Sequence, residues 1–443
     1  MTTAFARGNG LGRWALFGAM LAAVGLPVYI NAPKFYVDTY GVGLAALGAV
    51  LAGLRLFDVV QDPVLGWLAE RGRARRGLWV AVAGAVMAVS MVGLFAVAPP
   101  VAPLLWFALT LTGLFTAFSY LSIVFYAEGV AKAASLGRGG HLRLAGWREG
   151  GALAGITVAT VAPVLLGGFG VFAALFVGLV VLAVVLMAGQ WRSGAGAPVA
   201  IAAVAPVVAP AVAPAVAPVV ASALAPVVAP APVWASFRPA LADRHARRLL
   251  ILSFVNSVPV AITSTLFLFF VESRLAAPGR KGPLLLLFFV AAGVSAPVWS
   301  RLAARFGARR VLLWGMALAV VSFLWAARLE AGDVAAFAVI CAASGAALGA
   351  DMVLLPAMFA RRLDRMKQGG EAAGFGLWNF ASKLSLAFAA ATLLPTLQAV
   401  GFQAGVSNTP QALNWLTGLY ALLPCGLKLL AIGLLVASPK TEE

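Results

Sequence analysis

Apolar runs of about 20 residues recur along the whole length of this chain. Folded as a helix, a run of that length crosses the roughly 30 Å hydrocarbon core of a bilayer. Hydrophobic residues make up 62% of the 443 residues and charged residues only 11%, which is more apolar side chain than a soluble domain can bury. The sequence therefore predicts an all-α membrane protein with many transmembrane helices.

Twelve runs are predicted to be transmembrane helices. Their approximate limits are residues 11–31, 42–68, 78–98, 103–126, 146–168, 170–191, 248–271, 283–304, 309–328, 334–359, 373–397 and 412–437. The first run lacks a small-residue cleavage site, so we expect no cleaved secretory signal. With two histidines and two scattered cysteines, we expect no disulfide framework, no cofactor and no tightly bound metal.

A proline-rich segment separates the sixth and seventh runs. It is apolar, yet Pro206, Pro210, Pro214 and Pro218 recur every four residues. Proline at this spacing removes one helical hydrogen bond per turn, so the segment is not expected to span lipid. A polyproline-like or disordered linker is expected, with weak membrane-surface contact as the alternative. The predicted parts are an N-terminal six-helix half (1–192), a cytoplasmic linker (193–240) and a C-terminal six-helix half (241–443).

Basic residues gather in every second gap between the predicted helices. The positive-inside rule places those gaps and both termini in the cytoplasm, as in a multi-pass protein of the cytoplasmic (inner) membrane. The net charge of +17 therefore reflects orientation, and we expect no nucleic-acid partner. The basic turn WLAERGRARRG after the second run resembles SRLAARFGARR after the eighth. Two similar six-helix halves are typical of the major-facilitator fold.

The second predicted helix carries three charges on one face. Arg55, Asp58 and Asp62 in RLFDVVQDPVLGW are three and four residues apart, so a helix places them on the same side. Arg55 and Asp58 either form a structural salt bridge or belong to a site. Two acids with one base leave a surplus carboxylate, which suits a proton or a hard cation such as Na⁺. This pattern indicates a cation-coupled transporter.

Two other charges are predicted deep in the second half. Lys383 lies about ten residues into the eleventh run, too far from the helix end to reach the interface easily. Asp351, near the middle of the tenth run, is the expected partner. The pair is interpreted either as a bridge between helices or as a functional group at the membrane midplane. Asp351 is also expected to bind a hydroxyl or cationic group of the substrate.

Residues of the fourth and fifth runs are further candidates. Arg148 is either the last residue of a basic loop or a site residue, and Glu149 is expected to pair with Arg143 or His141. The glycine-rich stretch that follows them favours close helix packing. Hydroxyl groups on the fourth run either bond to their own helix or face Asp58. These hydroxyls belong to Ser119, Tyr120, Ser122 and Tyr126.

The remaining polar residues of the predicted helices form no catalytic motif, so the sequence does not predict an enzyme. Tyr29 and Asn31 are expected to reach a substrate from the outer end of the first run, and Lys428 is interpreted as a snorkelling or packing residue. The sequence has no serine nucleophile motif, no HExxH zinc motif and no phosphate loop.

The elements RLFDVVQDPVLGW, WREGGALAG and EAAGFGLWNFASKLSLA, in this order, resemble the glycoside–pentoside–hexuronide:cation symporter family. The resemblance covers the chain except for the proline-rich segment. It implies a major-facilitator fold that works by alternating access, with sugar uptake driven by H⁺, Na⁺ or Li⁺. By this resemblance Asp58 and Asp62 match the cation-site carboxylates, and Lys383 matches the eleventh-helix lysine that faces the cation site. Arg148 matches the fifth-helix arginine near the sugar, and Tyr126 a fourth-helix aromatic residue of the sugar pocket.

Two departures from the family's best-known member bear on the substrate. A sugar-binding acid of its first helix falls at Ala22 or Ala23 here, and a fourth-helix acid falls at Ser122. Loss of these acceptors makes the same disaccharide an unsuitable substrate, and one carboxylate fewer favours H⁺ over Na⁺.

We therefore expect a secondary active transporter, a monomer in the membrane lipid, that takes up a sugar, glycoside, uronide or related polar solute with a proton or, as the alternative coupling ion, Na⁺. A lysolipid carrier or exporter and a non-transporting membrane sensor are the alternatives. The cation-coupling residues are predicted to be Asp58, Asp62, Ser119, Ser122 and Lys383, with Arg55 as a structural charge partner. The substrate-binding residues are predicted to be Arg148, Tyr126, Asp351, Tyr29, Asn31 and Trp378.

Overall fold

The computed structural model describes residues 10–137, 139–191, 233–366, 370–403 and 408–437. Within helices it leaves a few side chains undescribed, and those of Tyr29 and Arg55 are among them. All regular structure in these residues is helical, and none of them lies in a β-strand. Of the predicted linker, only residues 233–240 fall inside the described part, and they belong to a short helix.

The helices form two groups in chain order. The first group is α2 (Leu11–Val24), α3 (Leu26–Tyr40), α4 (Leu44–Arg71), α5 (Arg76–Phe95), α6 (Pro103–Ser135), α7 (Gly140–Leu165) and α8 (Phe169–Met187). The second group is α10 (Val233–Ala242), α11 (Arg244–Phe269), α12 (Lys281–Phe306), α13 (Ala308–Ala326), α14 (Val334–Met366), α15 (Glu371–Ala399), α16 (Pro410–Thr417) and α17 (Leu423–Val436). A π-helical turn, Gly418–Leu422, joins α16 to α17.

Length and hydropathy agree with a protein that crosses the membrane many times. Nine helical stretches within the described residues are long and apolar enough to span a bilayer, and one of them, Ala46–Phe95, contains α5 and all but the first two residues of α4. The predicted first helix is wrong in its limits, because the chain breaks at Gly25 (φ −60°, ψ −102°) and then continues as α3 to Tyr40.

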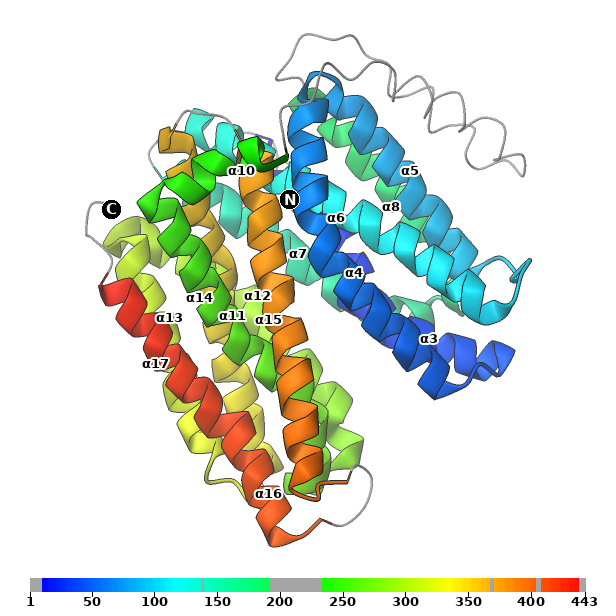
Figure 1. Ribbon diagram of the computed structural model, residues 1–443, viewed down its shortest axis with the longest axis vertical. Coiled ribbons are helices and arrows are strands. Elements are labelled where there is room, and N and C mark those ends of the chain that lie inside the picture. Colours follow the sequence, from blue (N-terminus) through cyan, green and yellow to red (C-terminus); the bar gives the residue numbers. More distant parts are fainter. Residues whose placement is uncertain (1–9, 138, 192–232, 367–369, 404–407, 438–443) are drawn as a thin grey trace.

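Helices α3, α4, α5, α6 and α8 lie on one side of Figure 1, and α11, α13, α14 and α17 lie on the other. Two helix pairs make the main connections between the groups, α4 with α15 and α7 with α12. Buried apolar residues from both groups also form one continuous core. A polar group at this junction therefore faces residues from both groups of helices.

Glycines set how closely these helices approach. On α7, a Cβ at Gly151 or Gly155 would overlap the backbone carbonyl of Ala15 or Ala19 in α2, so only glycine fits there. The predicted close packing of this glycine-rich stretch is confirmed. On the α4–α15 pair, a Cβ at Gly66 would lie 3.0 Å from the Cα of Gly376.

Polar contacts join the two groups at the end of the bundle where α4 ends and α15 begins. We call it the basic end, and it carries Arg71, Arg73, Arg75, Arg361 and Arg365. There the Glu70 carboxylate of α4 accepts hydrogen bonds from the backbone N–H groups of Gly370 (3.3 Å) and Ala372 (3.2 Å). An acid at this position satisfies the free donors of the α15 N-terminus and stabilises its positive dipole end.

Further ion pairs surround this contact. Between the groups, Arg73 lies 3.7 Å from Glu371, and Nε2 of His141 lies 3.6 Å from Asp364. Within the first group, Arg76 of α5 donates to Glu128 of α6, and both side chains are buried. The two groups of helices are thus joined by polar contacts at the basic end.

Candidate cation and substrate sites

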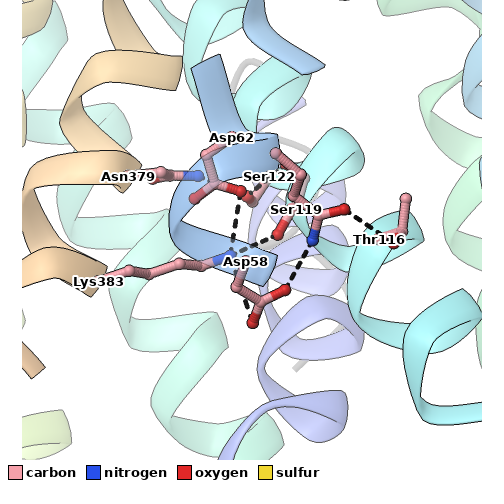
Figure 2. A network of polar contacts seen from close by, with 8 residues as sticks. Asp58, Asp62, Thr116, Ser119, Ser122, Asn379 and Lys383 are labelled. Atoms are coloured by element: carbon pink, nitrogen blue, oxygen red, sulfur yellow. Dashed lines mark hydrogen bonds and ion pairs between the residues drawn. The ribbon is translucent and has the colours of Figure 1, made fainter. Parts of the chain in front are cut away.

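A lysine of α15 lies between two carboxylates of α4 in Figure 2. Nζ of Lys383 is 3.0 Å from Oδ1 of Asp62 and 3.7 Å from Oδ2 of Asp58, and it donates to the Ser119 hydroxyl of α6 at 2.7 Å. Asp62 is fully buried and Asp58 is 5% exposed. The prediction that Lys383 pairs with Asp351 is wrong, because the α4–α15 contact brings Lys383 to acids of the first group.

Amide and hydroxyl groups extend this cluster. Gln61 donates to Oδ1 of Asp58 at 2.6 Å and accepts from Thr116 at 2.9 Å. Asn379 of α15 donates to Ser122 of α6 at 3.0 Å. Sequence reasoning missed Gln61, Thr116 and Asn379, although each lies three or four residues from a predicted member on the same helix and so shares its face.

Among the described side chains, the cluster has one more acid than base. Asp58 and Asp62 carry two formal negative charges and Lys383 one positive charge. The surplus-carboxylate argument had counted Arg55 as the base, so it stays a prediction. Oδ2 of Asp62 is buried without a hydrogen-bond partner among the described residues. Burying an uncompensated charge is costly, so a proton or a cation bound here would be stabilised by the site. The side chain of Arg55 lies outside the described residues.

A cavity of about 270 Å³ with both polar and apolar lining residues is connected to this cluster through α15, where Ser382 of the cavity wall adjoins Lys383. Its walls come from α6 and α7 of the first group and from α11, α14 and α15 of the second. Tyr126, Asp351 and Trp378, three of the predicted substrate residues, line it. The Trp378 ring also packs on Phe359, with ring centroids 5.1 Å apart. The tertiary structure thus brings three predicted residues from three helices to one cavity.

The guanidinium of Arg148 lies over one face of the Tyr126 ring. Its guanidinium carbon lies 3.7 Å from the ring centroid, and its Nε donates to Oε1 of Glu149 at 2.9 Å. The Tyr126 hydroxyl donates to the same carboxylate oxygen, also at 2.9 Å. Both side chains are buried, and Glu149 lines the cavity whereas Arg148 does not. The expected partners of Glu149, Arg143 and His141, are therefore wrong.

Asp351 has a different basic partner from the predicted one. Lys428 of α17 donates to Oδ2 of Asp351 at 2.5 Å and to Oδ1 of Asn256 in α11 at 2.7 Å. Lys428 is 4% exposed, so the snorkelling alternative is wrong, whereas a packing role between α17, α14 and α11 agrees with its contacts. Asn256 also lines the cavity, and no sequence pattern had marked it.

Two predicted substrate residues, Tyr29 and Asn31, lie on α3, and the structure does not place them at the cavity. The amide of Asn31 donates to the carbonyl oxygen of Pro27 in its own helix at 2.8 Å, and Asn31 is not one of the lining residues of the described cavities. The side chain of Tyr29 lies outside the described residues. Neither residue therefore contributes a described contact to the cavity.

Membrane-crossing helices, buried ion pairs between helices and an internal cavity with polar lining residues define a membrane transport protein. The comparisons name its family, since the family described as MFS/sugar transport protein matches residues 9–198 and 223–441. The chain belongs to this family and is a multi-pass membrane transporter, not an enzyme. The resemblance to a sugar:cation symporter family of the major facilitator superfamily is confirmed at this level.

Solved structures share the fold. The human organic anion transporter MFSD10 (TETRAN) is 15% identical with a TM-score of 0.58, over 97% of this chain and 99% of that chain. A bacterial homologue of the iron transporter ferroportin, in an outward-facing state with soaked iron, is 13% identical with a TM-score of 0.62, over 97% of this chain and 98% of that chain. No curated protein matches the chain.

Proposed function

We propose that this protein is a proton-coupled symporter that takes up a small polar organic solute such as a sugar or glycoside. In this proposal twelve helices in two six-helix halves alternate between outward-open and inward-open forms. One observation carries the proposal, the lysine of α15 that pairs with two buried acids of α4 (3.0 Å to Asp62) and adjoins Ser382 of the cavity wall. Through this pairing, the charge of the α4 acids in one half affects the position of α15 in the other half.

Helix α15 provides the link between the two sites. It carries Lys383 in the acid cluster, and the adjacent Ser382 and Trp378, which is five residues earlier, lie in the cavity wall. A proton on Asp58 or Asp62 weakens the attraction for Lys383, because the carboxyl loses its charge. The freed α15 then adjusts its contacts with substrate, so substrate and proton favour each other's binding.

The basic end supplies the proposed gate. Glu70, Gly66 and Gly376 hold α4 and α15 together there, which is what a form closed toward the cytoplasm requires. Separation of α4 from α15 at this end would break the Glu70 contacts and release both ligands. We assign the present conformation to the outward-facing stage of the cycle.

The composition of the cluster favours H⁺ over Na⁺. A sodium ion requires several oxygen ligands close together, and here the Lys383 ammonium already contacts Asp62 and Ser119. A proton needs only one carboxylate oxygen, and Oδ2 of Asp62, which has no hydrogen-bond partner among the described residues, is available for it. The coupling ion is accordingly proposed to be a proton.

Uptake into proteoliposomes tests the proposal. A labelled panel of neutral glycosides, uronides and lysolipids would be offered with an imposed pH gradient or Na⁺ gradient, to wild type and to Asp58→Asn. Gradient-driven accumulation of a sugar that the substitution abolishes is the expected result. Lysolipid movement without sugar-dependent proton flux, or ligand binding without accumulation, would overturn it in favour of a lipid carrier or a sensor.

A further inference from the structure

A second buried charge cluster lies in the cavity wall, formed entirely by the second group of helices. Lys428 of α17 joins Asp351 of α14 (2.5 Å) and Asn256 of α11 (2.7 Å). The three residues are 4%, 7% and 2% exposed. This cluster shares no residue with the proposed cation site, and the proposed proton coupling does not use it. It therefore needs an explanation of its own.

One oxygen of this cluster is unused. Oδ1 of Asp351 is buried and has no hydrogen-bond partner among the described residues, although a carboxylate accepts several hydrogen bonds. Asp351 lines the 270 Å³ cavity and also a smaller cavity of about 30 Å³ on the side of Lys428. A buried acceptor without a donor costs free energy. A donor on a bound molecule would remove that cost.

The charges around the cavity indicate what kind of donor fits. Glu149 and Asp351 are the charged residues that line the 270 Å³ cavity in the described part of the chain. Each has a base within 3 Å on its far side, Arg148 at 2.9 Å for Glu149 and Lys428 at 2.5 Å for Asp351. Neither base lines this cavity. The cavity thus presents carboxylate acceptors whose formal charges are already balanced.

Charged ligands fit this arrangement poorly. A ligand carboxylate would face two acids and find no base in the cavity wall. A ligand ammonium would bring an additional positive charge to acids that are already paired, and burial of an unbalanced charge is costly. A neutral hydroxyl donates to a carboxylate without changing the charge of the site.

We propose that Asp351, positioned by Lys428 and Asn256, binds a hydroxyl group of a neutral polyhydroxylated ring, and that the two balanced ion pairs select against uronides and amino sugars. The proposal rests on the proposed function only in that the cavity holds the transported solute. It deepens that function by choosing neutral rings from the wider class of polar solutes. The indole of Trp378 supplies an apolar wall for such a ring.

Equilibrium binding to the purified full chain in detergent tests this without transport. The ligands are methyl glucoside, methyl glucuronide and the methyl glycoside of glucosamine, which share one ring, together with the same three forms in the galacto and manno series. Ligand-induced thermal stabilisation reports the affinity. Wild type is expected to bind a neutral member at least about tenfold more tightly than its charged counterparts.

Charge-balance variants sharpen the test. Asp351→Asn is expected to weaken binding of the neutral ring at least about tenfold and to improve relative binding of the uronide, because Lys428 then lacks its counter-charge. The double variant Asp351→Asn/Lys428→Gln removes both charges and is expected to restore the preference for the neutral ring. The control is Glu272→Gln/Lys281→Gln, an ion pair at 2.6 Å whose side chains are 32% and 30% exposed and line neither cavity.

Three results would overturn the subsite. They are tighter binding of a charged ring by wild type, no binding of any member of the three series, and unchanged affinities in Asp351→Asn. Failure of the proposed function is separable from these outcomes. If neutral rings bind through Asp351 but no gradient drives their uptake, the subsite stands and the symport proposal fails. If gradient-driven uptake occurs but Asp351→Asn leaves binding unchanged, the symport proposal stands and the subsite fails.

Discussion

Gly66 of α4 and Gly376 of α15 face each other where the two groups of helices meet, and a Cβ on Gly66 would lie 3.0 Å from the Cα of Gly376. A Cβ on Gly376 would in turn lie 3.0 Å from the carbonyl oxygen of Asp62. Both neighbours are backbone atoms, so they yield only if the helices separate. This close approach also brings Lys383 near Asp62.

Substitution of either glycine is expected to push α4 away from α15. Gly66→Ala should lower the stability of the present conformation by about 1–3 kcal/mol, the usual cost of overpacking, and should slow transport. Gly53→Ala on the same helix is the matched control, because a Cβ there meets no atom within 4 Å. Thermal unfolding in detergent and uptake rates measure both effects. Equal behaviour of the two variants would contradict the proposed helix contact.

Adjacent glycines of α7 allow a stricter comparison. Gly151 lies against the backbone of Ala15, whereas a Cβ on Gly150 meets nothing within 4 Å. Gly151→Ala is expected to lower the thermal unfolding midpoint clearly or to prevent folding, since α2 and α7 must separate. Gly150→Ala should leave the midpoint nearly unchanged, and alanine even favours a helix intrinsically. A greater decrease of the unfolding midpoint in Gly150→Ala than in Gly151→Ala would show that α7 presents a different face to α2.

Removal of the Lys383 ammonium is expected to change the affinity of the acid cluster for cations. Lys383→Gln leaves Asp58 and Asp62 without their internal counter-ion, so the affinity for Na⁺ or Li⁺ is expected to rise by about tenfold, or about 1.4 kcal/mol. Gradient-driven accumulation should fall. Cation-dependent thermal stabilisation measures the affinity, and Lys281→Gln serves as a control lysine outside this cluster. Unchanged cation affinity would argue against Lys383 as a competing cation.

Asp243 at the start of α11 combines two roles that can be separated. Its carboxylate caps the helix by accepting from Ala246 N–H at 2.7 Å, and it accepts from Arg362 of α14 at 2.9 and 2.5 Å. Asp243→Asn keeps the cap and loses the ion pair. Asp243→Ala loses both and is expected to cost about 1 kcal/mol more, the usual value of an N-cap. Thermal unfolding midpoints at neutral pH provide the comparison.

The same residue predicts a pH dependence. The hydrogen bonds from Arg362 hold the pKa of Asp243 below its usual value. A carboxyl with a lowered pKa stabilises the folded state above its unfolded pKa of about 3.9, and that contribution disappears as the pH falls through the folded pKa. The stability advantage of wild type over Asp243→Asn should therefore be present at neutral pH and vanish in acid below about pH 4. A stability advantage of wild type over Asp243→Asn that increases below pH 4 would contradict this prediction.

Local sequence features predicted much of this protein because they depend on a single helix. Most of the predicted runs overlap a long helix, and the periodicity of Asp58 and Asp62 correctly placed both acids in one cluster. The exception within a run is Gly25, where a single residue breaks the helix and the apolar pattern continues across the break. An apolar composition predicts that a segment lies in the membrane, but it does not predict a helix break at a single residue.

The sequence by itself therefore determined the membrane class, the apolar helices, the face that Asp58 and Asp62 share and the close packing of the α7 glycines. The family resemblance had grouped Lys383 with Asp58 and Asp62, whereas reasoning from the residues alone paired it with Asp351. Only the tertiary structure decided between these partners, by placing Lys383 3.0 Å from Asp62, 321 residues away. It also decided that Asp351 meets Lys428 and that Glu149 rather than Arg148 lines the cavity. Periodicity places a side chain on one face of its own helix. Which partner it meets depends on how distant helices are rotated and shifted against each other, and that depends on packing between helices across the whole bundle.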